Sequence, residues 1–309
     1  MTSVELVNFL SSDKLRLPGV LFQPAQPTKQ IALWLHGMGD NGIFYNSTLI
    51  NELGESLTSR NIAFFAFNNR GAHLSKSLRI VNEEETRNEQ HYQAGTNYEL
   101  MKDSVHDIDG ATNYLRQRGF NELYLIGIST GANKICAYDD LSKRNPFSKY
   151  VLASPGDDTG LYYLELGDTR FWNAIKLAKK YVSEGKPLHL MPKKSGMYPF
   201  SAQSALDILD PDGEYNSFPY FEATQKRIGR KPLFKELSNF KKPTLAVLGE
   251  NDEWLEYIGG SRVALSVLKQ YSPQEIREKS DYIIIPNGDH SFHDKEHEFA
   301  ELVASWLKK

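Results

Sequence analysis

The stretch LIGISTGANK, residues 125–134, joins an apolar run to a cluster of small residues. It begins as an apolar run typical of a buried strand and ends on Ser129, which stands between Gly127 and Gly131. Glycine weakens a strand and often marks a place where another backbone or a ligand comes close. At roughly 7% each for Gly and Ser, a G-x-S-x-G pattern arises by chance about 0.1 times in a chain of this size. The motif therefore has to be tested against the rest of the sequence.

Bulk properties exclude several classes of protein. The 309 residues are 40% hydrophobic and 24% charged, with a net charge of −3, and the basic residues are scattered. We therefore expect neither a nucleic-acid partner nor an anionic membrane surface. The first nineteen residues lack a signal-peptide pattern, and no apolar run approaches 18 residues, so we expect no membrane span. A single cysteine, Cys136, fits a reducing compartment, and we expect a cytoplasmic protein.

Short apolar runs alternate with amphipathic segments along most of the chain. The expected strands are 4–10, 15–22, 31–35, 62–67, 123–128, 150–153, 244–248 and 282–285. The expected helices include 98–118, 130–141, 262–271 and 296–308. Strands without polar alternation, separated by helices, indicate a mostly parallel sheet covered on both faces. The sequence therefore predicts the α/β class.

Residues 156–240 break this alternation. They are rich in aromatic residues, and glycines and prolines interrupt them. A segment of this length is too long for one loop. We interpret it as an inserted, largely helical subdomain over a core formed by residues 1–155 and 241–309.

Chemically useful side chains follow three of the expected strands. Ser129 follows 123–128, Asp252 follows 244–248, and His290 follows 282–285. Because parallel strands end at one edge of a sheet, these side chains are expected to meet there. A serine hydroxyl needs a base to become a nucleophile, and a histidine oriented by a carboxylate is such a base. The sequence predicts a Ser129–His290–Asp252 triad.

The same edge supplies candidate donors for an oxyanion hole. A helix begins directly after Ser129, so the backbone N–H of Thr130 points toward a bound carbonyl. The second expected donor is the N–H of Met38, which follows His36 and Gly37 at the end of strand 31–35. Each such donor contributes about 2.7–4 kcal/mol to transition-state stabilisation.

Other residues compete for these roles. Glu250 and Glu253 flank Asp252, which we favour because it lies four residues beyond Leu248. His293 and His297 compete with His290, which we favour because it follows a Gly-Asp turn at a strand end. We expect no metal, since the three histidines lack an H-E-x-x-H pattern and the chain lacks clustered cysteines. His36 is expected to be structural, as is Cys136. We expect Asn69 and Arg70 to shape a loop.

With these residues in place, the chain resembles the α/β-hydrolase superfamily over nearly its whole length. The resemblance rests on four motifs: WLHGMG (34–39), GISTG (127–131), GEND (249–252) and NGDHSF (287–292). The segment GTNYELMKDSVHDIDGA (95–111) is similar to a little-characterised branch that includes fungal siderophore esterases. The resemblance implies an eight-stranded sheet, a cap inserted after the sixth strand, and ester hydrolysis through an acyl-serine without a cofactor. Ile128 stands where many relatives carry histidine or tyrosine, which concerns the shape of the pocket.

Three functions remain open at this point. The favoured one is a serine hydrolase that cleaves a carboxylic ester, thioester or lactone of a small molecule. A small-molecule binding protein on the same scaffold is the second, since a fold does not dictate a function. An acyltransferase is the third, because it shares the acyl-enzyme and differs only in the nucleophile that accepts the acyl group.

Overall fold

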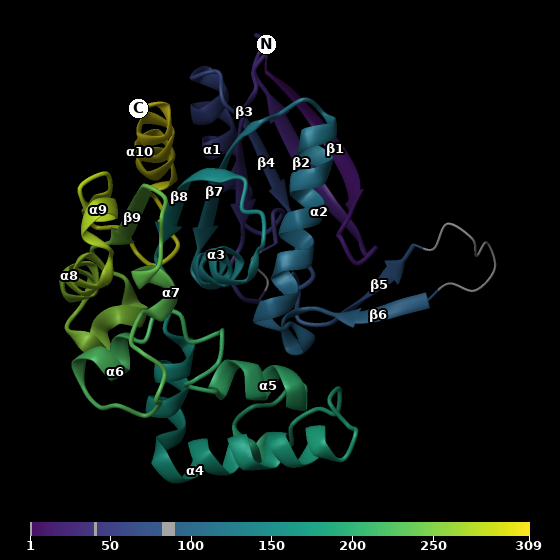
Figure 1. The fold of residues 1–309 in the computed structure, drawn as a ribbon, viewed down its shortest axis with the longest axis vertical. Coiled ribbons are helices and arrows are strands. Elements are labelled where there is room, and N and C mark those ends of the chain that lie inside the picture. Colours follow the sequence, from purple (N-terminus) through teal and green to yellow (C-terminus); the bar gives the residue numbers. More distant parts are fainter. Residues whose placement is uncertain (1, 40–41, 82–89) are drawn as a thin grey trace.

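The computed structural model describes residues 2–39, 42–81 and 90–309. Its main sheet has eight strands in the order β1-β2-β4-β3-β7-β8-β9-β10 (Figure 1). Strands β3, β4 and β7 to β10 are parallel, while β1 and β2 pair antiparallel to their neighbours. The bounds are β1 Ser3–Leu10, β2 Arg16–Gln23, β3 Gln30–Leu35, β4 Ala63–Phe67, β7 Glu122–Ile128, β8 Phe147–Ala153, β9 Thr244–Gly249 and β10 Asp281–Ile285. The predicted α/β class and the mostly parallel eight-stranded sheet are confirmed.

Helices cover both faces of the sheet. On one face pack α1 (Ser47–Ser59) and α10 (Glu296–Lys308), which also contact each other. On the other face pack α2 (Ser104–Gln117), α3 (Thr130–Leu141) and α8 (Ser261–Tyr271), with the short α9 (Gln274–Arg277) before β10. Because both faces are buried, the central strands carry continuous apolar runs such as AFFAF in β4 and TLAVLG in β9. None of the helices described is long and apolar enough to cross a membrane.

The residues between β8 and β9, here called the insert, are largely helical. They form α4 (Asp158–Ser183), α5 (Ala202–Leu209), α6 (Tyr220–Thr224) and α7 (Lys235–Ser238). In Figure 1 α4 and α5 lie together at one end of the sheet. Tyr163, Phe171, Met197 and Phe221 of the insert belong to an apolar cluster that also contains Met101 and Ala137 from outside the insert. β8 is the sixth strand of the main sheet in chain order.

Helix α2 begins later than the sequence pattern predicts. The expected helix starts at residue 98, whereas α2 starts at Ser104 after two 3₁₀ turns, Thr96–Tyr98 and Met101–Asp103. The backbone here bonds to the insert: Ser201 N donates to Asn97 O (2.7 Å), and Met101 N donates to the Asp207 carboxylate (2.7 Å). Tertiary bonds thus replace the first helical turn.

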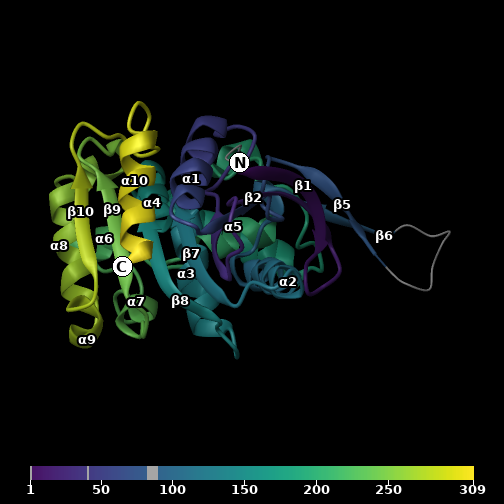
Figure 2. The ribbon, with the colours of Figure 1, turned by 90° about the horizontal axis from the view of Figure 1, so that it is seen from above.

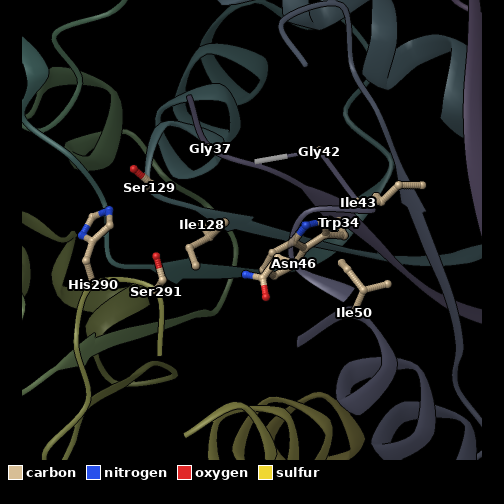
Figure 3. Close-up of a pocket in the computed structure, with 10 residues that line it drawn as sticks. All are labelled: Trp34, Gly37, Gly42, Ile43, Asn46, Ile50, Ile128, Ser129, His290 and Ser291. Atoms are coloured by element: carbon tan, nitrogen blue, oxygen red, sulfur yellow. The ribbon is translucent and has the colours of Figure 1, made fainter. Parts of the chain in front are cut away.

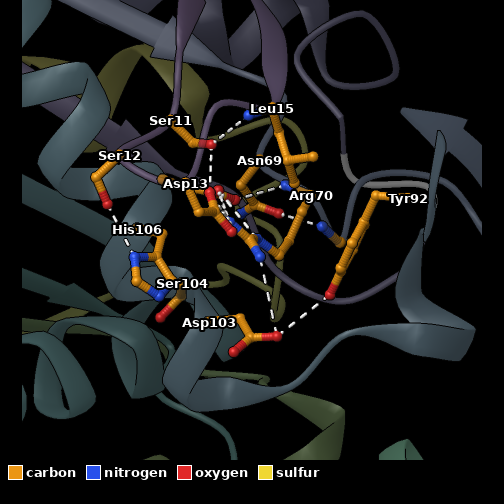
Figure 4. A network of polar contacts seen from close by, with 12 residues as sticks. Ser11, Ser12, Asp13, Leu15, Asn69, Arg70, Tyr92, Asp103, Ser104 and His106 are labelled. Carbon is orange, nitrogen blue, oxygen red and sulfur yellow. Dashed lines mark hydrogen bonds and ion pairs between the residues drawn. The ribbon is translucent and has the colours of Figure 1, made fainter. Parts of the chain in front are cut away.

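A two-stranded hairpin, β5 (Lys76–Ile80) and β6 (Gln90–Ala94), projects from the body of the molecule (Figures 1 and 2). The sequence pattern does not predict this hairpin, because KSLRI and QHYQA carry no apolar run. Its base is fixed by Arg70, which is buried among carboxylates at the end of β4. Arg70 binds Asp13 (2.8 Å) and Asp107 (2.8 Å), and its guanidinium stacks on the ring of Tyr92 in β6 (Figure 4). Arg70 therefore shapes the loop, as expected.

Candidate active site

Ser129 occupies a strained turn between β7 and α3. Its φ of 52° and ψ of −126° are unfavourable for any residue with a β-carbon. The turn is possible because Gly127 and Gly131, on either side of it, have no side chains. A Cβ on Gly127 would lie 2.3 Å from Gly131 O, and one on Gly131 would lie 2.2 Å from Leu35 O. The two glycines of the motif thus allow β3, β7 and α3 to meet closely around the serine.

Asp252 and His290 come from adjacent strands and form a hydrogen-bonded pair. Nδ1 of His290 lies 2.9 Å from Oδ1 and 3.0 Å from Oδ2 of Asp252. Their two loops are joined by Asn251 N, which donates to Gly288 O (2.7 Å). The Asp252 side chain is 1% exposed and that of His290 is 13% exposed. The pair is therefore shielded but not sealed from solvent.

The charge state of His290 is set by opposing effects. Burial disfavours the imidazolium, but the hydrogen bond and the charge of Asp252 favour it, and the net effect raises the pKa of His290 above its ordinary 6.5. The charges of Glu253 and Asp158 add to this increase. The hydrogen bond to Asp252 uses Nδ1 of His290. The other ring nitrogen, Nε2, therefore remains available to accept a proton on the side of the ring where Ser129 lies.

The structure brings His290 and Ser129 into the same two cavities. A narrow cavity of about 20 Å³ is lined by both residues, by Gly37, Gly42, Asn46 and Ser291, and by apolar side chains. These apolar side chains are Trp34, Ile43, Ile50 and Ile128 (Figure 3). In Figure 3 the imidazole of His290 and the hydroxyl of Ser129 lie on the same side of the cavity. Ile128 therefore shapes the wall next to Ser129, as its position in the motif predicts.

A wide cavity of about 340 Å³ opens on the other side of the same pair. Its wall includes Met38 from the loop after β3 and Trp254 from the 3₁₀ turn Glu253–Ile258. The insert contributes residues of α4 and the segment that precedes it. The lining residues are Met38, Ser129, Gly156, Asp158, Leu161, Tyr162, Glu165, Trp254, His290 and Ser291. Its size is in the range of small-molecule sites.

The two expected oxyanion donors lie beside the serine. Thr130 is buried as the first residue of α3. Met38 follows Gly37, where an added Cβ would lie only 3.0 Å from the Cβ of Ser129. The loop is anchored by Gly39 N, which donates to the hydroxyl of Thr96 (2.9 Å). The sequence pattern does not indicate this role for Thr96, since a lone threonine after a polar strand carries no signal.

His36 is a neutral structural residue. Its Nε2 accepts a hydrogen bond from Asn69 N (3.2 Å), so Nδ1 carries the proton and donates to Gly37 O (2.8 Å). Burial, with the nearby charge of Lys134, holds the pKa of His36 well below its usual value. The imidazole thereby fixes the start of the loop that carries Met38.

The competing histidines have other partners, while Glu253 accepts a hydrogen bond from the backbone N of His290 (3.2 Å) and the imidazole pairs with Asp252. His293 pairs with Asp289 (2.7 Å) and His297 with Glu52 (2.8 Å). The three candidate histidines thus face three different carboxylates, and the described residues contain no cluster of three or more His, Cys, Asp or Glu side chains arranged to hold a metal. Glu250 binds Arg262 (3.0 Å) at the surface. Cys136 is buried in the core, and burial raises the pKa of its thiol well above the ordinary value.

Two acidic residues of this site were missed by the sequence analysis. Asp158 and Glu165 lie on α4 and line the wide cavity. Their signal was the helical spacing of Asp158, Leu161, Tyr162 and Glu165, which places all four on one face. This spacing is hard to recognise in the sequence, because the insert contains many aromatic residues.

The sheet order, the strained serine turn and the paired histidine and aspartate define a protein of the α/β-hydrolase fold. The chain belongs to the family described as "Protein of unknown function (DUF1749)", whose model matches residues 90–308. The sequence has no significant match among curated proteins.

Solved structures of esterases and of a siderophore hydrolase share this fold. The siderophore hydrolase EstB from Aspergillus fumigatus is 15% identical, with a TM-score of 0.66 over 99% of this chain and 97% of its own. Est1E from Butyrivibrio proteoclasticus, with ferulic acid bound, is 13% identical, with a TM-score of 0.61 over 97% of each chain. Esterase Pf2001 from Pyrococcus furiosus is 13% identical, with a TM-score of 0.59 over 99% of this chain and 91% of its own.

Proposed function

We propose that this protein is a serine hydrolase that cleaves a carboxylic ester through an acyl-enzyme. The observation that supports it most directly is that His290, hydrogen-bonded to Asp252, lines the same two cavities as the strained Ser129. Strain at a site where catalytic side chains converge is characteristic of a preorganised nucleophile. The esterases and the siderophore hydrolase that share this fold agree with this proposal.

In the first half of the reaction, Nε2 of His290 takes the proton of the Ser129 hydroxyl as Oγ attacks the ester carbonyl. The carbonyl oxygen becomes negatively charged and accepts hydrogen bonds from the N–H groups of Met38 and Thr130. When the C–O bond to the alcohol breaks, His290 returns the proton to the departing oxygen. Asp252 holds the imidazole ring and stabilises its charged form throughout.

In the second half, water replaces the alcohol and His290 takes one of its protons. The resulting hydroxide attacks the acyl carbonyl, and Ser129 leaves with the proton from His290. Since the alcohol must depart and water must enter, we assign the alcohol to the wide cavity and the retained acyl group to the narrow one. The insert, which contributes α4 to the wide cavity, then acts as a cap over the alcohol.

Labelling with a fluorophosphonate probe tests the proposal. The native protein is expected to be labelled and to hydrolyse p-nitrophenyl acetate, while Ser129→Ala does neither. Ser291→Ala is the matched control, because Ser291 carries the other hydroxyl that lines both cavities. Equal labelling of native protein and Ser129→Ala, or no labelling and no turnover of either, would overturn the proposal.

A further inference from the structure

The first two turns of α4 present a mixed acidic and apolar stripe to the wide cavity. Asp158, Leu161, Tyr162 and Glu165 follow the i, i+3, i+4, i+7 spacing of one helix face, and all four line the cavity. None of the ten described residues that line this cavity is lysine or arginine. The wall therefore carries two carboxylates with no permanently charged cation beside them in the lining.

Asp158 faces Ser129 across Gly156, which has no side chain. A Cβ added to Gly156 would lie 3.8 Å from both Ser129 Oγ and Asp158 Oδ2, so no side chain separates the hydroxyl from the carboxylate at this point. The hydroxyl of Thr130, whose N–H is a proposed oxyanion donor, lies 3.4 Å from Asp158 Oδ2. The carboxylate thus lies within the field of the reacting atoms.

The negative charge of Asp158 shifts the pKa of other ionisable groups around the cavity. Its charge is among the causes that raise the pKa of His290. Burial raises the pKa of the Tyr162 hydroxyl, and the charges of Asp158 and Glu165 raise it further. Burial also raises the pKa of Asp158 itself, so its ionised form lacks full solvation.

Such a carboxylate opposes the negative charge that develops on the ester oxygen during attack. For a neutral or anionic ester this repulsion raises the barrier, whereas a substrate cation near Asp158 cancels it and supplies the missing counter-charge. The rings of the cavity favour the same ligand. Trp254 is 51% exposed and Tyr162 stands on the wall with the carboxylates, and aromatic faces bind alkylammonium groups.

We propose that the wide cavity selects esters whose alcohol carries a positive charge, an ammonium or trialkylammonium group, bound by Asp158 with Glu165 and the rings of Tyr162 and Trp254. This inference rests on the proposed ester hydrolysis at Ser129. Asp158, half-buried and nearest to the serine, makes the larger contribution. Glu165 is exposed and acts at the rim, where solvent weakens its field.

A pair of isosteric esters tests the charge preference. Acetylcholine and 3,3-dimethylbutyl acetate have the same shape, and only the first is charged. The native protein is expected to show a kcat/KM for acetylcholine at least about tenfold higher, which corresponds to about 1.4 kcal/mol. Asp158→Asn is expected to reduce this ratio about fivefold or more, and Glu165→Gln about twofold. Glu275→Gln, which removes an exposed carboxylate on α9, is the matched control and leaves the ratio unchanged.

Binding of choline and of 3,3-dimethylbutan-1-ol to the native protein, measured by calorimetry, gives a readout that needs neither a variant nor turnover. Tighter binding of choline supports the proposal, and equal or weaker binding overturns it. If Ser129 is labelled and both acetates are cleaved with equal kcat/KM, the charge preference is wrong while ester hydrolysis stands. If neither acetate is cleaved and Ser129 is not labelled, ester hydrolysis is wrong, and choline binding alone decides whether the cavity accepts cations.

Discussion

The imidazole of His290 reaches both oxygens of the Asp252 carboxylate, with Nδ1 at 2.9 Å and 3.0 Å. The Asp252 side chain is 1% exposed, so its carboxylate interacts mainly with the groups that hydrogen-bond to it. These groups are the ring of His290 and the N–H of Trp254 (3.1 Å). The same contact therefore orients the ring and stabilises its protonated form. Both effects are measurable through the pH dependence of turnover.

Ester turnover is expected to rise with pH through an apparent pKa above 6.5, because only neutral His290 acts as a base and Asp252 stabilises its charged form. Asp158→Asn removes one negative charge, so it lowers the pKa of His290 and moves the acidic limb to lower pH. Asp252→Asn is expected to reduce kcat by about 10³–10⁴. The measurement is kcat/KM for p-nitrophenyl acetate from pH 5 to 9.

Glu275→Gln serves as the control for the pH profile and keeps the native limb. A profile that is flat from pH 5 to 8 would contradict the role of His290. An acidic limb that moves to higher pH in Asp158→Asn would contradict the assigned electrostatic influence of Asp158.

Short acyl groups are expected to be preferred, because the narrow cavity of about 20 Å³ has room for roughly one water-sized molecule. The kcat/KM of p-nitrophenyl esters should fall from acetate to butyrate to octanoate. Ile50→Ala, which enlarges this cavity from α1, is expected to raise the butyrate-to-acetate ratio about tenfold. Leu57→Ala deletes a buried side chain of the same helix away from the cavity and leaves the ratio unchanged. Equal ratios in the two variants would contradict the assignment.

Strain at Ser129 predicts an unusual order of stabilities. Ser129→Gly removes the β-carbon that makes φ 52° and ψ −126° unfavourable, a cost of about 1–3 kcal/mol, against about 0.5–1 kcal/mol of added chain entropy. We expect Ser129→Gly to be about 1 kcal/mol more stable than Ser129→Ala in urea unfolding. At Ser266, an exposed residue in the middle of α8, the same pair should show the reverse order. Glycine destabilising both sites equally would show that the turn is unstrained.

The sequence predicts the strands and the residues at their ends because both depend on local pattern. Buried strands need continuous apolar runs, and parallel order brings Ser129, Asp252 and His290 to one edge without knowledge of any contact. The hairpin of β5 and β6 escaped prediction because its strands carry no continuous apolar run: only Leu78, Ile80 and Tyr92 pack against the core, and they are partly buried.

The cavities were beyond the reach of sequence patterns for a different reason. The narrow one is closed by Ile50 of α1 and by Asn46 just before that helix, and the wide one by Trp254 and α4, segments that lie far apart in the chain. Their volumes depend on how side chains pack, which no periodicity encodes. The acidic stripe of α4 was visible in principle, but only a known helix boundary at Asp158 reveals that its members share a face.

A buried ion pair behind the serine gives the last prediction. Lys134 of α3 lies 2.7 Å from Glu99, with side chains 1% and 7% exposed. Lys134→Met leaves the carboxylate buried and unpaired, so it is expected to cost about 3–5 kcal/mol of unfolding free energy, and Glu99→Gln is expected to destabilise through the orphaned ammonium. The double variant should recover more than half of that loss, because no buried charge remains. Lys180→Met, which breaks an exposed pair with Glu184, is expected to cost less than about 1 kcal/mol. Additive losses in the double variant, measured by urea unfolding, would show that the two charges do not depend on each other.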